Sequence, residues 1–175
     1  MTTVPLAAAN GHVLTGAGAV VISGGPSLFT DPGVGATLHG QLAFVDRLAQ
    51  PMLGICLGHQ GLGARAGVRV HRGTERRCAE RIVPCEEHPL FAGLPDAFPM
   101  VADHCEGIPL PPGWRLLASS AHYPVEAMAS QRLPHLGVQF HPEVSGEPGR
   151  RLLHNFCRLA REHNGQGGRP AGQEE

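Results

Sequence analysis

The first third of the chain alternates short apolar runs with glycine-rich turns and stretches of helical spacing, and no other feature restricts the fold as strongly. Residues 19–23 (AVVIS) form a β-branched run that stops at a Gly-Gly-Pro turn, which predicts a buried strand. Residues 52–55 predict a second strand, whereas residues 36–49 and 58–64 predict helices. Strands that alternate with helices in this way predict a parallel sheet covered by helices.

The middle third differs, because its apolar runs are short and are separated by turns rather than helices. Five runs are candidate strands: residues 68–71, 81–84, 100–103, 114–119 and 125–129. They predict a small antiparallel extension of the sheet. Residues 136–140 predict a further strand, and residues 149–162 predict a helix with one apolar side.

The chain length of 175 residues fits one domain with a sizeable core. The segment from Asn164 onward is rich in glycine and polar residues, which predicts disorder. We therefore expect a single domain over residues 1–163, followed by a disordered tail over residues 164–175.

Composition excludes several classes of function. A formal net charge of −1 gives no footprint for nucleic acid, and no apolar run approaches the length of a membrane span. The N-terminus lacks the pattern of a secretory signal, and the five cysteines are odd in number and irregularly spaced, so we expect a reducing, cytoplasmic location. The eleven histidines form no standard metal-ligand spacing, so no metal site is expected.

Residues 54–58 (GICLG) have the form of a nucleophile elbow, a sharp strand-to-helix turn, with Cys56 at its centre. Such a turn holds the nucleophile in a strained backbone, and the flanking glycines remove Cβ atoms that would clash. The N-terminus of the following helix lowers the pKa of a thiol placed there. A small buried cysteine without function is the alternative, and the strand context favours the nucleophile.

His141 and Glu143 follow the strand predicted for residues 136–140, at the carboxyl edge where open α/β sheets form their sites. A thiol nucleophile needs a base, and the base needs an orienting partner. A histidine with a glutamate two positions later, across a rigid proline, supplies both. Alone, these two residues would indicate an ordinary loop, but together with Cys56 they predict a catalytic triad.

Three segments resemble the class I glutamine amidotransferases: residues 23–26 (SGGP), 51–60 (PMLGICLGHQ) and 137–144 (GVQFHPEV). The resemblance extends over about residues 4–159. It implies a doubly wound, mostly parallel, flavodoxin-like sheet with a small antiparallel extension. It also implies that Cys56 is the nucleophile, His141 the base and acid, and Glu143 the orienting carboxylate.

The resemblance implies further roles within the site. The backbone N–H groups of Gly25 and Leu57 would form the oxyanion hole, which meets the requirement for donors aimed at a developing negative oxygen. Residues 103–106 would bind the amino-acid end of glutamine through backbone groups. The substrate-binding residues expected from this comparison are Gln60, His104, Cys105 and Glu106.

Residues 88–95, 110–114 and 117–120, together with Val144, look most like the glutaminase subunit of GMP synthase. This likeness implies hydrolysis of glutamine to glutamate and ammonia through a Cys56 thioester, with the ammonia passed to a synthase partner of the ATP-pyrophosphatase type for GMP synthesis from XMP. No cofactor is expected in this chain, because ATP and magnesium would belong to the partner. Residues 103–106 (DHCE) depart from the Ser-His-Gly-Asp pattern of that subfamily, which bears on the identity of the partner.

Members of this family begin with a strand and a helix before the segment that matches residues 3–6, so this first strand and helix are expected to be missing here. Residues 3–6 would then be the family's second strand. Three alternatives remain open: a glutaminase subunit of anthranilate or aminodeoxychorismate synthase, a catalytically silent partner-binding protein, and a γ-glutamyl peptidase.

Overall fold

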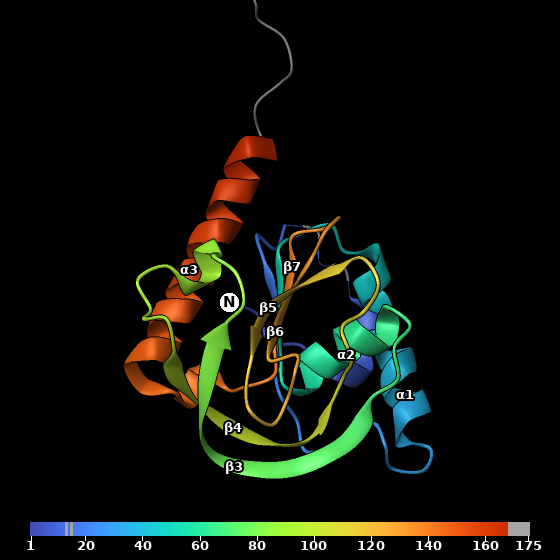
Figure 1. The fold of residues 1–175 in the computed structure, drawn as a ribbon. Coiled ribbons are helices and arrows are strands. Elements are labelled where there is room, and N and C mark those ends of the chain that lie inside the picture. Colours follow the sequence, from blue (N-terminus) through green and yellow to red (C-terminus); the bar gives the residue numbers. More distant parts are fainter. Residues whose placement is uncertain (13, 15, 168–175) are drawn as a thin grey trace, which may run out of the picture.

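A seven-stranded mixed sheet forms the centre of the computed structural model, which describes residues 1–167 except 13 and 15. The strands lie in the order β1-β2-β7-β6-β5-β3-β4 (Figure 1). Their bounds are β1 Val20–Ile22, β2 Met52–Ile55, β3 His71–Pro84, β4 Phe98–Gly107, β5 Trp114–Ser119, β6 Ala127–Ser130 and β7 His135–Val138.

The sheet is more antiparallel than the sequence predicts. Only the pairs β1–β2 and β2–β7 are parallel, whereas β7–β6, β6–β5, β5–β3 and β3–β4 are antiparallel. A parallel pair needs a crossover of a dozen or more residues, usually a helix. The middle of the chain has only short connections between its strands, so these strands pair as hairpins and extend the sheet over most of its width.

Helices cover the parallel half on both faces. Helix α2 Leu57–Arg65 packs on one face with α1 Val34–Gln41 and the 3-10 helix η2 Leu42–Arg47, and α3 Gly146–Gly167 lies on the other side (Figure 1). Two apolar cores result. One contains Leu42, Met52 and Leu62, and the other contains Phe140 and Phe156.

Several predicted elements differ in extent from the observed ones. The single helix predicted over residues 36–49 is divided into α1 and η2, and Gly40, a poor helix former, lies just before the change. The strand expected at residues 3–6 is not formed. Instead, Pro5 precedes the 3-10 helix η1 Leu6–Gly11, which packs against η2. The predicted tail begins within α3, since this helix continues to Gly167, and residues 168–175 lie outside the described residues.

Strand β3 is a single strand of 14 residues where the sequence predicts two short ones. Its exposed positions carry charged residues, which hide the strand from an apolar pattern. It pairs with β4 along most of its length, with an irregularity between Arg72 and Arg76, and reaches β5 only at Val83 and Pro84. In Figure 1 this hairpin curves around one end of the molecule.

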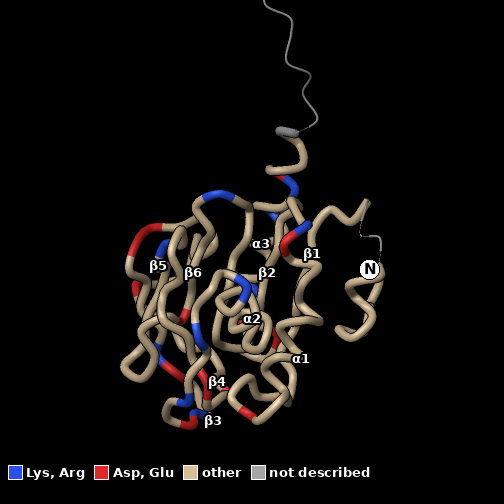
Figure 2. The backbone as a smooth tube through the Cα atoms, turned by 90° about the vertical axis from the view of Figure 1, so that its right-hand side faces the viewer, with Lys and Arg blue, Asp and Glu red and all other residues tan. Residues whose placement is uncertain are grey.

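Charged residues are interspersed rather than separated by sign. Figure 2 shows acidic and basic positions side by side at the β3–β4 end, where Arg72 pairs with Asp31 and Arg77 with Glu75. Among residues 1–167, with the two gaps noted above, no helix combines the length and the apolar character that a bilayer crossing requires.

Candidate active site

Cys56 lies at the turn between β2 and α2, as the sequence predicts. Its backbone has φ 49° and ψ −105°, and it is the only non-glycine residue with positive φ in the described part of the chain. The turn is held from both sides: Cys56 N–H donates to the carbonyl of Val138 at 2.9 Å, and Gln60 N–H donates to the carbonyl of Cys56 at 3.0 Å. The strained conformation is therefore fixed by β7 and by the first turn of α2.

The glycines around the elbow let three segments approach closely. A Cβ atom at Gly58 would lie 2.3 Å from the carbonyl oxygen of Ile22, and one at Gly54 would lie 2.7 Å from the backbone of Gly58. Real Cβ atoms do not come so close to backbone. These positions therefore require glycine, and they place α2 directly against β1 and β2.

His141 follows β7 and is fixed by backbone and side-chain contacts. Its N–H donates to the carbonyl of Val101 in β4 at 2.8 Å, and its carbonyl accepts from Ser145 Oγ at 2.6 Å. Its Nδ1 lies 2.7 Å from Oε1 of Glu143. Glu143 thus orients the ring, which is the relation that the sequence predicts for these two residues.

The electrostatics of His141 connect it to both predicted partners. Hydrogen bonding to Cys56, then to Glu143, raises the pKa of His141 to about 10, although burial opposes the shift. Its Nε2 is buried, and no other group in the described chain hydrogen-bonds to it with standard geometry. Burial works against ionisation of Glu143, but its hydrogen bonds to His141 and to backbone outweigh this, so the pKa of this carboxyl is lowered.

The Ser23–Pro26 turn after β1 closes over this pair. A Cβ atom at Gly24 would lie 2.8 Å from Cε1 of His141 and 3.4 Å from Cβ of Cys56. The neighbouring Gly25 lies beside Leu57, since its Cβ would be 3.6 Å from that side chain. Among the described residues, neither the N–H of Gly25 nor that of Leu57 donates a hydrogen bond. The two predicted oxyanion donors therefore lie on adjoining segments next to the thiol.

The predicted substrate-binding residues lie beside the elbow, mostly in the interior. Gln60 donates from Nε2 to the carbonyl of Glu106 at 3.2 Å, and Nδ1 of His104 lies 3.1 Å from the same oxygen. The sulfur of Cys105 instead lies 3.5 Å from Nη1 of Arg72. The closest approach of this segment to the thiol is through backbone, because Cys56 Sγ is 4.0 Å from the carbonyl of Asp103.

The side chain of Tyr123 is a support of this segment that the sequence did not suggest. Its ring packs edge-on against His104 with centroids 4.5 Å apart, and its hydroxyl donates to the carbonyl of Thr74 at 2.8 Å. Cβ atoms at Gly73 or Gly107 would lie 2.6 or 2.5 Å from this side chain, so two glycines make room for it. That pair of glycines on facing strands was the available signal.

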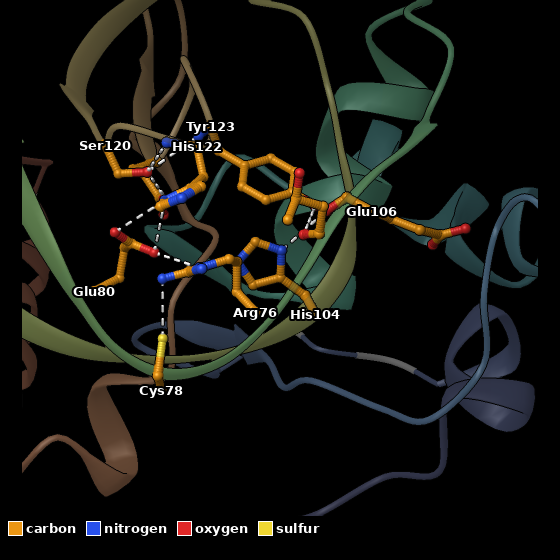
Figure 3. Close-up of polar contacts among 10 residues, drawn as sticks. Arg76, Cys78, Glu80, His104, Glu106, Ser120, His122 and Tyr123 are labelled. Atoms are coloured by element: carbon orange, nitrogen blue, oxygen red, sulfur yellow. Dashed lines mark hydrogen bonds and ion pairs between the residues drawn. The ribbon is translucent and has the colours of Figure 1, made fainter.

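A chain of charged and polar groups adjoins this support (Figure 3). Glu80 accepts from Arg76 Nε at 2.8 Å and lies 3.2 Å from Nδ1 of His122. Ser120 donates to Glu126 Oε1 at 2.8 Å. Burial raises the pKa of Glu126 to about 7 against the hydrogen bond from Ser120. This network ties the loop between β5 and β6 to β3. No group of three or more His, Cys, Asp or Glu side chains in the described chain is arranged to hold a metal ion.

Comparison with known proteins gives a family for this fold and site. The sequence matches the family described as glutamine amidotransferase class-I over residues 2–160. The chain belongs to the class-I glutamine amidotransferases.

Two relatives are glutamine-hydrolyzing GMP synthases or subunits of them. The subunit of this name from Thermococcus kodakarensis is 38% identical over 146 residues, which cover 82% of this chain and 76% of that protein. The glutamine-hydrolyzing GMP synthase of Thermus thermophilus is 38% identical over 144 residues, covering 81% of this chain but 28% of that longer protein.

A solved structure agrees with the fold. The crystal structure of a Thermoplasma acidophilum protein described as a GMP synthase subunit superposes with a TM-score of 0.84 at 26% identity, covering 95% of this chain and 83% of that one. A glutamine amidotransferase from Thermotoga maritima, with a TM-score of 0.62 and 20% identity, shares the fold. The class predicted from the sequence is thus confirmed, and the parallel-rich sheet is corrected to a mixed one.

Proposed function

We propose that this chain is the glutaminase subunit of a GMP synthase, which hydrolyses glutamine to glutamate and ammonia. One observation carries the proposal: the strained Cys56 and the Glu143-oriented His141 converge beneath Gly24, and interaction with Cys56 contributes most to the raised pKa of His141. A protonated imidazole beside a thiol is the arrangement that thiol nucleophiles use.

The reaction begins with attack of the Cys56 thiolate on the side-chain carbonyl carbon of glutamine. The carbonyl oxygen becomes an oxyanion, which accepts hydrogen bonds from the N–H groups of Gly25 and Leu57. His141 then donates its proton to the amide nitrogen, the C–N bond breaks, and ammonia leaves a γ-glutamyl thioester. His141, now neutral, removes a proton from water, whose attack on the thioester releases glutamate and restores the thiolate.

Glutamine is held, in this proposal, by backbone groups of residues 103–105, because the carbonyl of Asp103 is the part of that segment nearest to Sγ of Cys56. Gln60 and His104 support the segment from behind through the carbonyl of Glu106. The Glu106 carboxylate is fully buried against another loop, so its role in binding is indirect.

Ammonia released in water would be protonated and lost, so a glutaminase subunit passes it to a synthase. The names of the relatives favour a synthetase subunit that makes GMP, and we propose an ATP-pyrophosphatase type partner that carries the ATP and magnesium. The glutaminase subunits of anthranilate and aminodeoxychorismate synthases are the competing assignment, and none of the relatives given above carries such a name.

The test is a reconstitution. The purified chain is mixed with the synthetase subunit of a GMP synthase, XMP, ATP and magnesium, and GMP is measured with glutamine or with ammonium chloride as nitrogen donor. We expect GMP from glutamine only when the chain is present, and from ammonium with or without it. Glutamine-dependent product only with a chorismate-using synthase would move the assignment to the competing class. A lack of glutaminase activity with both partner types would indicate the catalytically silent alternative.

A further inference from the structure

Glu106 is a buried carboxylate that the chemistry above does not use. It lies in β4, and its side chain is 0% exposed. Its Oε1 accepts from Thr30 N–H at 2.7 Å, and its Oε2 accepts from Phe29 N–H at 3.0 Å. Figure 3 shows this side chain extending away from His104 and Tyr123. A carboxylate without solvent is stable only when such donors satisfy it, so these two contacts are strong ones.

The loop that Glu106 holds is the one that carries the proposed oxyanion donor. It runs from the end of β1 at Ile22 to the start of α1 at Val34, and Gly25 precedes Phe29 by only four residues. Most of this loop lacks pairing with the sheet. Its place above Cys56 therefore depends on the few contacts that reach it from other elements.

Glu106 also connects this loop to the elbow helix. Its backbone carbonyl accepts from Gln60 Nε2, and Gln60 lies in the first turns of α2 behind Cys56. One residue thus holds the helix through its main chain and the Gly25 loop through its side chain. The separation of the two oxyanion donors, on Gly25 and on Leu57, is fixed through this residue.

Arg72 provides a second hold on the same loop. It faces Glu106 in the register of β3 and β4. Its Nε donates to Thr30 Oγ1 at 3.0 Å, and its Nη2 donates to Asp31 Oδ1 at 2.8 Å. The side chains of Arg72 and Asp31 are 54% and 45% exposed, so this hold is weaker than the buried one.

We propose that Glu106 is a positioning residue, which sets the oxyanion donor of Gly25 by clamping residues 29–30 to β4, with Arg72 as a secondary clamp. The inference rests on the proposed glutaminase function. It assigns Glu106 to the transition state rather than to binding of glutamine. A misplaced donor weakens stabilisation of the oxyanion while leaving glutamine binding by residues 103–105 intact.

The principal test is Glu106→Gln in the full chain. An amide keeps the size but replaces one acceptor with an N–H that opposes a backbone N–H. We expect kcat for glutamine hydrolysis to fall about 30-fold, as a partial loss of oxyanion stabilisation would cause, and KM to change less than about threefold. Alkylation of Cys56 by iodoacetamide needs no oxyanion, so its rate should stay within about twofold. A rise in KM with unchanged kcat would overturn the proposal in favour of direct substrate binding.

Hydrogen exchange tests the clamp without activity. In Glu106→Gln, amide exchange of residues 23–33 should accelerate about tenfold or more, while exchange in β2 and α2 remains at the parent rate. The matched control is Glu75→Gln, an exposed glutamate on the same hairpin, which should change neither exchange nor kcat. Unchanged exchange of residues 23–33 in Glu106→Gln overturns the clamp, whatever the activity.

Arg72→Gln keeps the test decisive if Glu106→Gln folds poorly. We expect acceleration of exchange confined to the same loop and a fall in kcat of about threefold, with KM unchanged. Exchange at the parent rate in this loop, or acceleration spread over the whole sheet, would contradict the secondary clamp. A parent chain without glutaminase activity, alone or with a synthetase, would refute the proposed function, and the exchange data would still decide on the clamp.

Discussion

The two halves of the sheet are built by different means. In the parallel half, β1, β2 and β7 are brought together by glycines that leave no space for a side chain, as at Gly54 and Gly58. In the antiparallel half, polar groups join the elements, with Glu80 and Glu126 buried between β3 and the β5–β6 loop. Close backbone packing holds the nucleophile rigidly, whereas the polar network supports the segment at residues 103–106 and makes it responsive to charge.

The comparison predicts that chemistry depends most on the parallel half. Cys56→Ser should lower glutamine hydrolysis by about a thousandfold or more, because removal of a triad nucleophile costs orders of magnitude, while the thermal midpoint changes little. The measurement is ammonia release over time, with circular dichroism as the check on folding. Residual activity within about tenfold of the parent would remove Cys56 from the mechanism.

Backbone packing can be tested with two glycines that differ in their surroundings. Gly58→Ala would force a methyl group to 2.3 Å from the carbonyl of Ile22, so we expect a loss of about 3 kcal/mol in the free energy of unfolding. Gly40→Ala is the matched control, because a Cβ there meets nothing within 4 Å and α1 gains a better helix former, about 0.5 kcal/mol. Equal effects in urea unfolding would mean that the parallel half is not packed as tightly as described.

The polar half should respond to pH. The pKa of Glu126 is about 7 in the folded chain, above the usual 4.5, so the protonated form favours folding. Its contribution is fully present below about pH 4.5 and is lost as the pH rises through about 7. Glu126→Gln should therefore gain about 1–2 kcal/mol relative to the parent between pH 5 and pH 8. A parallel pH dependence of the two proteins would show that Glu126 is not held neutral.

The smallest expected effect is that of a single hydroxyl. Tyr123→Phe removes the hydrogen bond to the carbonyl of Thr74 but keeps the ring between Gly73, Gly107 and His104. We expect a loss of about 1 kcal/mol in the free energy of unfolding, with kcat preserved within about twofold. A kcat loss beyond about tenfold would instead make the hydroxyl part of the site and weaken the division between the two halves.

The sequence predicted the parallel half well, because its signals are local. The strand over residues 52–55 and the elbow at Cys56 follow from a short apolar run and its flanking glycines, and the structure contains both. The Cys56, His141 and Glu143 roles remain proposals, although the structure brings these residues together as expected. The match to the class-I amidotransferases confirms the family that these motifs indicated.

The antiparallel half was harder to predict for physical reasons. Strand β3 carries arginines on its exposed side, so the alternation of apolar residues that reveals a half-buried strand is absent. The contact of Glu106 with Phe29 and Thr30 joins positions 77 and 76 residues apart, and no local pattern encodes it. Burial of Glu80 and Glu126 likewise depends on tertiary neighbours that only the folded chain supplies.

The positive φ of Cys56 places stability and activity in opposition at one position. A non-glycine residue in such a conformation is strained by about 1–3 kcal/mol, and glycine would adopt it without that strain. Drift toward greater stability would thus favour loss of the thiol, and only selection for catalysis keeps a side chain here. In a lineage released from that selection, position 56 is where we expect the first substitutions, well before the surrounding glycines change.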